Sequence, residues 1–181
     1  MKTSIRFVAT LVAFIVVAGS ISSCKKKEKE NTYVIEYPVS FNVPAHTDNV
    51  EFDMVDTMLA SKLSQTASAA GVSLDKVKSV KLNSMRLSID PVDVANGATF
   101  DAYHYANAHL RTASNPEKQI AFITTVPQNK TELTFESQHE EWVDYLKQNE
   151  FHIRVKAYHE TDVPPTNYTL NVSFDVVYMG E

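Results

Sequence analysis

The sequence predicts a mainly β protein, a two-layer antiparallel β-sandwich that carries two helices. Three observations support this fold class. Apolar and polar residues alternate near both ends of the domain, strand-like segments outnumber helical ones, and no regular strand-helix-strand alternation runs through the 181 residues. An immunoglobulin-like topology fits the pattern, although the cysteine and tryptophan markers of true immunoglobulin domains are absent from the sequence. A barrel of the lipocalin type is the alternative architecture.

The first and last segments of the domain show the alternation most clearly. Every odd-numbered residue from Tyr33 to Val43 is apolar, and so is every even-numbered residue from Tyr168 to Tyr178. Alternation with a period of two predicts strands that have one buried face. Pro38 has no backbone N–H to donate, so we expect the first strand to lie at a sheet edge or to contain a bulge.

The segments between these two predict further strands. Residues 151–158 alternate with the odd-numbered side chains facing inward, and the loop containing Pro164-Pro165 is expected to join them to the last strand as a hairpin. The apolar pattern changes face near Asn83-Ser84, which predicts a bulge. Other strands are expected at residues 77–89, 105–112, 119–125 and 131–137, with a short one at 50–54.

Two helices are expected to interrupt the sheets. Apolar residues recur at helical spacing from about residue 56 to residue 70, and Gly71 suits a left-handed cap at the end of this helix. Acidic residues just before the segment are expected to stabilise the start of the helix. A second, short helix is expected at about 139–148, where Ser137 opens a capping-box pattern.

The domain carries a strong negative charge. From Asn31 to Glu181 there are 11 Lys and Arg residues against 20 Asp and Glu residues, a net charge of -9, compared with -5 for the whole chain. Because such a surface is repelled by phosphate backbones, we expect no nucleic-acid partner. The length of this segment indicates a single domain.

Four oxygen-bearing side chains in one twelve-residue segment are candidates for a metal site: Asp90, Asp93, Asn96 and Asp101. Oxygen ligands at short spacing are typical of calcium sites, but this spacing does not match an EF-hand loop. Asp-Pro and Asn-Gly pairs are also ordinary turn formers, so a double turn is expected and calcium is the alternative. The histidines have no spacing typical of a zinc site, and we expect no cofactor.

The sequence contains three candidate residues for binding a glycan. Tyr103, Tyr105 and Tyr158 are expected on outward-facing positions, where aromatic rings can stack on sugars. No glycine-rich phosphate loop, nucleophile elbow or recognisable Ser-His-Asp spacing is present, so we expect no catalytic residues. The alternative is a hydrolase whose site is built from carboxylates that are distant in the sequence.

The first 24 residues are arranged like a bacterial secretory signal. Lys2 and Arg6 precede an apolar segment at residues 7–18, which is too short to span a bilayer, and small residues then lead into the run Ile21-Ser22-Ser23-Cys24. This run resembles the lipobox of bacterial lipoproteins. The resemblance implies cleavage after Ser23, lipid transfer to the sulfur of Cys24, acylation of the new amino terminus by a chain such as palmitate, and location in the cell envelope, with the outer membrane favoured.

These expectations combine into one description of the chain. Residues 1–23 form a lipoprotein signal peptide, residues 24–32 the lipidated cysteine with a charged tether, and residues 33–181 a single β-sandwich domain. We expect a non-catalytic binding or structural module, held on the membrane by lipid, for a protein or glycan partner. An envelope hydrolase is the alternative function.

Overall fold

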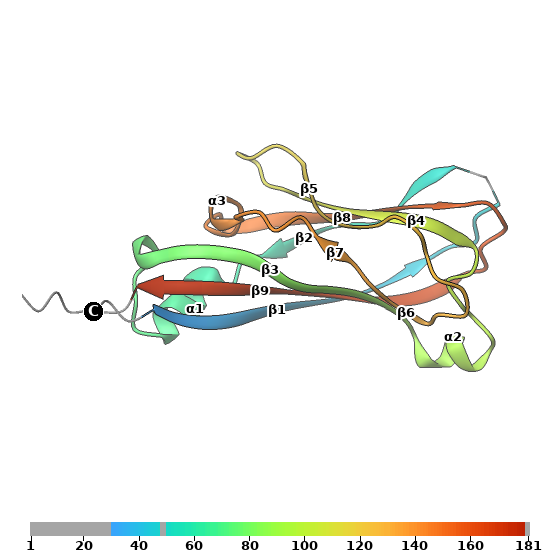
Figure 1. Cartoon of the computed structure of the whole chain (residues 1–181), viewed down its shortest axis with the longest axis horizontal. Helices are drawn as coiled ribbons and strands as arrows, with labels where there is room; N and C mark the ends of the chain where they lie inside the picture. The colour runs from blue at the N-terminus through green and yellow to red at the C-terminus, as the bar shows by residue number, and fades with distance from the viewer. Residues whose placement is uncertain (1–29, 48–49, 180–181) are drawn as a thin grey trace, which may run out of the picture.

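The computed structural model describes residues 30–47 and 50–179, which form two antiparallel sheets packed face to face (Figure 1). The four-stranded sheet has the order β1-β9-β3-β6, and the five-stranded sheet has the order β2-β8-β4-β5-β7. The strands are β1 (Glu30–Val43), β2 (Glu51–Ala60), β3 (Val77–Ile89), β4 (Tyr103–Arg111), β5 (Lys118–Ile123), β6 (Glu132–Thr134), β7 (Glu136–Ser137), β8 (Glu150–His159) and β9 (Thr166–Met179). The helical segments are α1 (Leu63–Ala69), the 3₁₀ turn η1 (Leu74–Lys76), α2 (Pro91–Ala95) and α3 (Val143–Leu146). The predicted two-layer antiparallel sandwich is confirmed.

The two ends of the described chain lie together at one end of the sandwich, which we call the near end (Figure 1). β1 pairs with β9 along its whole length, with Glu30 opposite Met179. Since β1 has 14 residues, the opposite or far end is about 45 Å away. α1 and α3 lie toward the near end and α2 at the far end. Among the described residues, no helix has the length and hydropathy needed to cross a membrane.

The predicted alternation places the core between the two sheets. In β8 the odd-numbered side chains from Phe151 to Ala157 are buried and the even-numbered ones between them are partly exposed. In β9 the even-numbered side chains from Tyr168 to Tyr178 are buried. The register of β3 against β9 shifts between Leu82 and Ser84, which confirms the predicted bulge. These strands therefore bury one face each, as the sequence indicates.

The edge strand β1 is protected against pairing with another strand. Its edge position agrees with the expectation from Pro38. The ammonium of Lys62 donates to the backbone oxygen of Glu36 at 2.6 Å, so this carbonyl points toward the open side of the strand. Backbone groups of alternate residues point the same way, so Pro38 leaves the same side without an N–H. The middle of this edge therefore presents few free backbone hydrogen-bonding groups with which a further strand could pair.

The predicted helix at 56–70 is wrong over its first half. β2 continues to Ala60, and α1 begins at Leu63 and has seven residues. Val55 and Leu59 fit helical spacing, but they also fit alternation with Thr57, and the antiparallel pairing with β8 selects the strand. Gly71 has a φ of 71° two residues after α1, as expected for a left-handed turn at that place.

The second predicted helix, at about 139–148, is also shorter than expected. α3 contains only four residues, Val143–Leu146. The hydroxyl of Ser137 accepts a hydrogen bond from the backbone N–H of His139 at 3.1 Å, and His139 itself has a φ of 54°. The capping-box pattern therefore forms a local turn after β7, and the helix begins later.

The predicted hairpin between the last two long strands is wrong. β8 is paired on both sides in the five-stranded sheet, with β2 and β4, whereas β9 lies between β1 and β3 in the other sheet. The Pro164-Pro165 loop therefore crosses from one layer to the other. The segment predicted as one strand at 131–137 also changes layers, because β6 pairs with β3 and β7 pairs with β5.

Candidate binding face

Cys24, the predicted lipidation site, lies with the rest of residues 1–29 outside the described part of the chain. β1 begins at Glu30, so residues 30–32, which were expected in the tether, belong to the first strand. A lipid anchor at Cys24 would therefore be connected to the sandwich at its near end.

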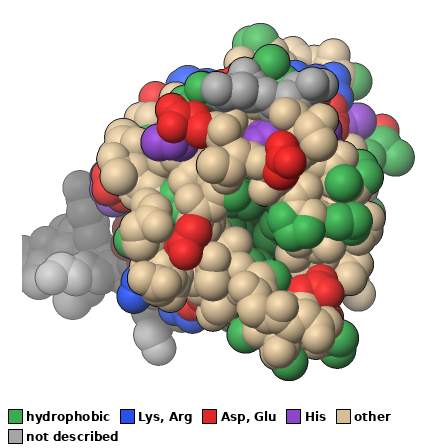
Figure 2. Space-filling view, turned by 90° about the vertical axis from the view of Figure 1, so that its right-hand side faces the viewer, with side chains coloured by type: hydrophobic (Ala, Val, Ile, Leu, Met, Phe, Trp, Pro, Cys, Tyr) green, Lys and Arg blue, Asp and Glu red, His purple; other side chains and the backbone are tan. Residues whose placement is uncertain are grey.

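The four calcium candidates lie at the far end, which Figure 2 faces, around α2. Asp90 caps α2 by accepting a hydrogen bond from the backbone N–H of Val92 at 2.9 Å. Asp93 accepts from the backbone N–H of Asn167 at 2.7 Å. Asn96 is the last capping residue of α2, and Asp101 accepts from the backbone N–H of Asn129. Within the described ranges no three His, Cys, Asp or Glu side chains come together closely enough to hold a metal ion.

The structure separates the three predicted glycan-binding tyrosines. Tyr103 is buried, and its hydroxyl lies 3.0 Å from that of Tyr168 inside the sandwich, so its expected outward position is wrong. A register shift between Tyr103 and Tyr105 turns Tyr105 to the outer surface. There it stacks on Tyr158 of β8, with ring centroids 5.3 Å apart and planes 11° apart. Only Tyr105 and Tyr158 are brought together.

Three strands of the five-stranded sheet, β2, β8 and β4, place charged side chains on its outer surface, which we call the charged face. The Nε atom of Arg154 in β8 lies 3.4 Å from Asp53 and 3.3 Å from Asp56, both in β2, and its Nη1 atom lies 3.3 Å from Glu117. Arg111 in β4 donates to Asp56 at 2.8 Å. Two arginines therefore hold three carboxylates in one network.

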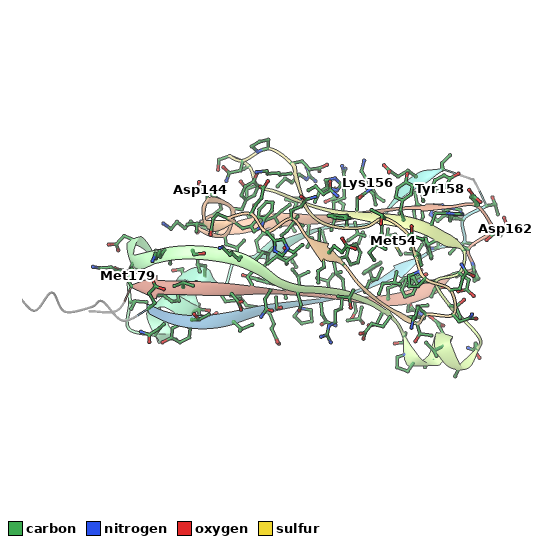
Figure 3. The ribbon with its side chains drawn as sticks, viewed as in Figure 1. Met54, Asp144, Lys156, Tyr158, Asp162 and Met179 are labelled. Carbon is green, nitrogen blue, oxygen red and sulfur yellow. The ribbon has the colours of Figure 1, made fainter. Side chains whose placement is uncertain are left out.

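The stacked tyrosines belong to a second group of contacts on the same face. The hydroxyl of Tyr105 donates to Glu51 at 3.2 Å, and the ammonium of Lys156 lies 3.5 Å from the same carboxylate. Figure 3 shows Lys156 and Tyr158 projecting outward from β8, whereas Met54 of β2 points between the sheets. The charged face therefore combines aromatic and ionic side chains whose positions are fixed by one another.

The network keeps Asp56 ionised. Burial raises the pKa of Asp56, but the hydrogen bond and charge of Arg111 outweigh it, with smaller contributions from His152 and Arg154, so the pKa lies below its usual value. The side chains of Asp56 and Arg154 are only 25% and 26% exposed. Linked pairs of this kind contribute more to stability than isolated pairs on a fully exposed surface.

His109 of β4 also lies on the charged face, and its pKa is lowered. Burial lowers its pKa, the positive charges of Lys156 and Arg154 lower it further, and the negative charge of Glu117 opposes the change. The Nδ1 atom of His109 is buried and has no hydrogen-bond partner within the described part of the chain. At neutral pH this ring is therefore uncharged.

Asp56 does not have the properties of the proton-donating acid in a glycosidase-type pair. Such a pair needs one carboxylic acid with a raised pKa that can donate a proton. The lowered pKa of Asp56 makes it a carboxylate at neutral pH, and Asp53 and Glu117 share Arg154 with it. Asp56 itself therefore cannot supply the protonated acid of such a pair.

Several residues of this face were not candidates from the sequence, in particular Arg111, Glu117 and Arg154. The usable signal was the alternation in β8, which places basic side chains outward, together with acidic side chains in residues 51–56. Asp56 lies directly opposite Arg154 in the register of β2 and β8. The prediction of a helix from residue 56 hid this cross-strand pair.

Comparison with models of known protein families gives no match, and no curated protein matches the sequence. Among solved structures, the chain aligns with the VP2 subviral particle of infectious bursal disease virus at a TM-score of 0.40 and 9% identity, over 94% of this chain and 37% of that chain. A structure of the Gx strain of infectious bursal disease virus gives a TM-score of 0.38, with the same identity and coverage. The chain thus spans little more than a third of these viral chains, and similarity this low supports no argument.

Proposed function

We propose that this protein is a lipid-anchored lipoprotein of the cell envelope, in the outer membrane, whose sandwich binds a protein partner through the charged face without catalysing a reaction. The lipobox-like run ending at Cys24 supports the anchor. Since β1 starts at the near end six positions after Cys24, the proposed anchor would be attached at that end. An anchor at this place leaves the outer surfaces of both sheets free of the membrane.

The stacked pair of Tyr105 and Tyr158, on the same sheet face as the ion-paired Arg111 and Arg154, is the observation that carries the binding proposal. Tyrosine and arginine are enriched among the residues that dominate binding energy at protein interfaces. Side chains already held in position lose little conformational freedom on binding, which lowers the cost of association. The charged face therefore has the composition and rigidity of a protein-binding surface.

A glycan partner on this face is the second candidate and is less well supported. In the stacked pair each ring covers one face of the other, so fewer open ring faces remain for a sugar. The third tyrosine of the expected platform, Tyr103, lies in the core. We therefore assign a protein rather than a glycan to the charged face.

Site-specific photo-crosslinking in intact cells tests the partner. A photoreactive amino acid replaces Tyr158 on the charged face or, as a matched control, Asn42, which is exposed on the outer surface of the four-stranded sheet. We expect a discrete protein adduct from position 158 and none from position 42, and the adduct should disappear when Tyr105→Ala is added. Equal adducts from both positions would contradict the assignment.

Fatty-acid labelling tests the anchor. Because the sulfur of Cys24 is the proposed lipid acceptor, Cys24→Ser should give an unprocessed precursor without label, and the wild-type protein should leave the membrane only with detergent. Ser23→Ala, which keeps a small residue before the cysteine, is the control and should remain labelled. Label retained by Cys24→Ser would rule out the lipoprotein assignment.

A further inference from the structure

The outer surface of the four-stranded sheet has a hollow of about 310 Å³ at the middle of the sheet. Its lining crosses all four strands: Glu36 and Pro38 of β1, Asn171 and Ser173 of β9, Ser84 and Arg86 of β3, and Glu132 of β6. The hollow lies on the side of the sandwich opposite the charged face. It is therefore a separate candidate site.

The hollow exists because short side chains occupy the middle of the sheet. Ser84 and Ser173 lie opposite each other in the register of β3 and β9, and their hydroxyls are 2.8 Å apart. One hydroxyl donates to the other, and both short side chains stay close to the sheet. Two residues along the strands, Pro38, Asn171 and Arg86 are aligned across β1, β9 and β3. These side chains are larger than the two serines and border the low area that the serines leave.

The charges around the hollow select the kind of ligand. Arg86 makes no ion pair with any residue in the described ranges, unlike Arg111 and Arg154 on the other face. Glu36 and Glu132 line the same hollow and are exposed. Two carboxylates oppose an anion such as phosphate, and Arg86 offsets one of their two charges, which leaves a net charge of only -1 among uncharged hydroxyl and amide groups. This mostly uncharged polar lining fits a neutral ligand best.

The donors and acceptors indicate that this neutral ligand carries several hydroxyl groups. Carboxylate, amide and guanidinium groups each present two polar atoms side by side, which can pair with two adjacent hydroxyls. The exposed ring of Pro38 supplies an apolar surface next to them. From these features we infer that the hollow is a binding site for a neutral saccharide.

A second hollow indicates that the saccharide is a chain rather than a single sugar. It has a volume of about 430 Å³, lies between the end of β5 and β6, and includes Thr125 and Lys130. Glu132 lines both hollows. A chain of several sugar units can cross β6 at this residue and occupy both, so affinity should increase from a monosaccharide to a hexasaccharide.

Calorimetric titration of the full-length lipoprotein tests the site, in a detergent without a sugar head group. The probes are glucose, neutral hexasaccharides of β-1,4-linked glucose, α-1,4-linked glucose and β-1,4-linked mannose, and, for comparison, hexagalacturonate and inorganic phosphate. We expect saturable binding of at least one neutral hexasaccharide, with one ligand per protein and weaker binding of glucose. No binding of any neutral hexasaccharide, or binding of phosphate or hexagalacturonate alone, would overturn the proposal.

Two substitutions in the hollow locate the binding. Arg86→Met and Asn171→Ala should each weaken the hexasaccharide about tenfold or more, because each removes hydrogen bonds to the ligand. Lys81→Met, at an exposed lysine of the same strand β3, is the matched control and should bind like the wild type. Unchanged affinity in both hollow variants, with unaltered thermal melts, would contradict the assignment. Tyr158→Ala should leave the titration unchanged, so this proposal and the protein-binding proposal can fail independently.

Discussion

The outer surfaces of the two sheets carry different kinds of side chain. On the charged face, Arg111 and Arg154 reach across β2, β8 and β4 to carboxylates at 2.8 to 3.4 Å. On the four-stranded sheet, hydroxyl and amide groups pair with their direct neighbours, as in the contact of Ser84 with Ser173. Long side chains that pair above a sheet fill the space over it, whereas short ones leave a hollow. The same strand alternation thus produces a surface suited to a large partner and another suited to a small ligand.

The largest expected effect concerns the core that the two faces share. Phe174 of β9 is fully buried and packs edge-on against Tyr37, with ring centroids 6.0 Å apart. Phe174→Asp should unfold the domain, because an unpaired buried carboxylate costs several kcal/mol, comparable with the whole stability of a small domain. Asp175→Ser removes only an outward carboxylate that accepts from Asn83 and should cost less than about 1 kcal/mol. Thermal melts that shift equally would show that the assigned inward face is wrong.

The next largest expected effect is a difference in stability between removing an arginine from one face and removing an arginine from the other. Arg154→Met should lower the free energy of unfolding by about 1–2 kcal/mol, because it leaves Asp53, Asp56 and Glu117 with less compensating charge. Arg86→Met, which removes an arginine without an ion-pair partner among the described residues, should change it by less than about 0.5 kcal/mol. Urea unfolding measures both. Similar losses in the two variants would remove the distinction between the faces.

A smaller effect is the pH dependence expected from His109 of the charged face. Because burial lowers the pKa of His109 in the folded protein, the unfolded chain binds more protons as the pH falls below about 6.5. The contribution of His109 to the free energy of unfolding is therefore complete above this pH and declines toward pH 5. Over the same range Asp56, with its lowered pKa, stays ionised in the folded and the unfolded states. His109→Gln should flatten this decline in urea midpoints. A decline of the same size in His109→Gln would assign it to another group.

The smallest expected effect is at the far end. Since Asp90, Asp93 and Asp101 already accept hydrogen bonds from separate backbone N–H groups, calcium at about 1 mM should leave the melting temperature unchanged. An upward shift in the wild type that disappears in the double variant Asp93→Asn, Asp101→Asn would instead demonstrate calcium binding to the folded state.

The sequence was a good guide wherever one face of a strand is buried. The alternation in β8 and β9 predicted the inward side chains correctly, since a period of two leaves only one consistent face. In β1 it was correct for Ile35, Tyr37 and Val43, whereas Tyr33 at the near end is exposed. It could not say which strands are neighbours, and the predicted hairpin between β8 and β9 failed for that reason. The spacing of Val55 and Leu59 is compatible with helix and strand alike, so the choice depended on pairing with β8.

The candidate site was less predictable because it depends on register between distant segments. Glu117 lies before β5 and meets Arg154 of β8 only after three strands are aligned. The shift between Tyr103 and Tyr105 turns one ring inward and the other outward, and parity alone cannot reveal such a shift. The hollow around Arg86 likewise requires the alignment of β1, β9 and β3.

The pairing of Glu30 with Met179 brings the two ends of the described fold next to each other, so the chain can be circularly permuted. A short linker could join these residues while new ends are opened at Gly97, an exposed turn residue at the far end. With the signal and Cys24 run placed before the new first residue, the sandwich would be held by its far end with both sheet surfaces unaltered. If the partner then still binds, recognition depends on the surfaces alone; if it does not, the orientation of the domain relative to the membrane is part of recognition.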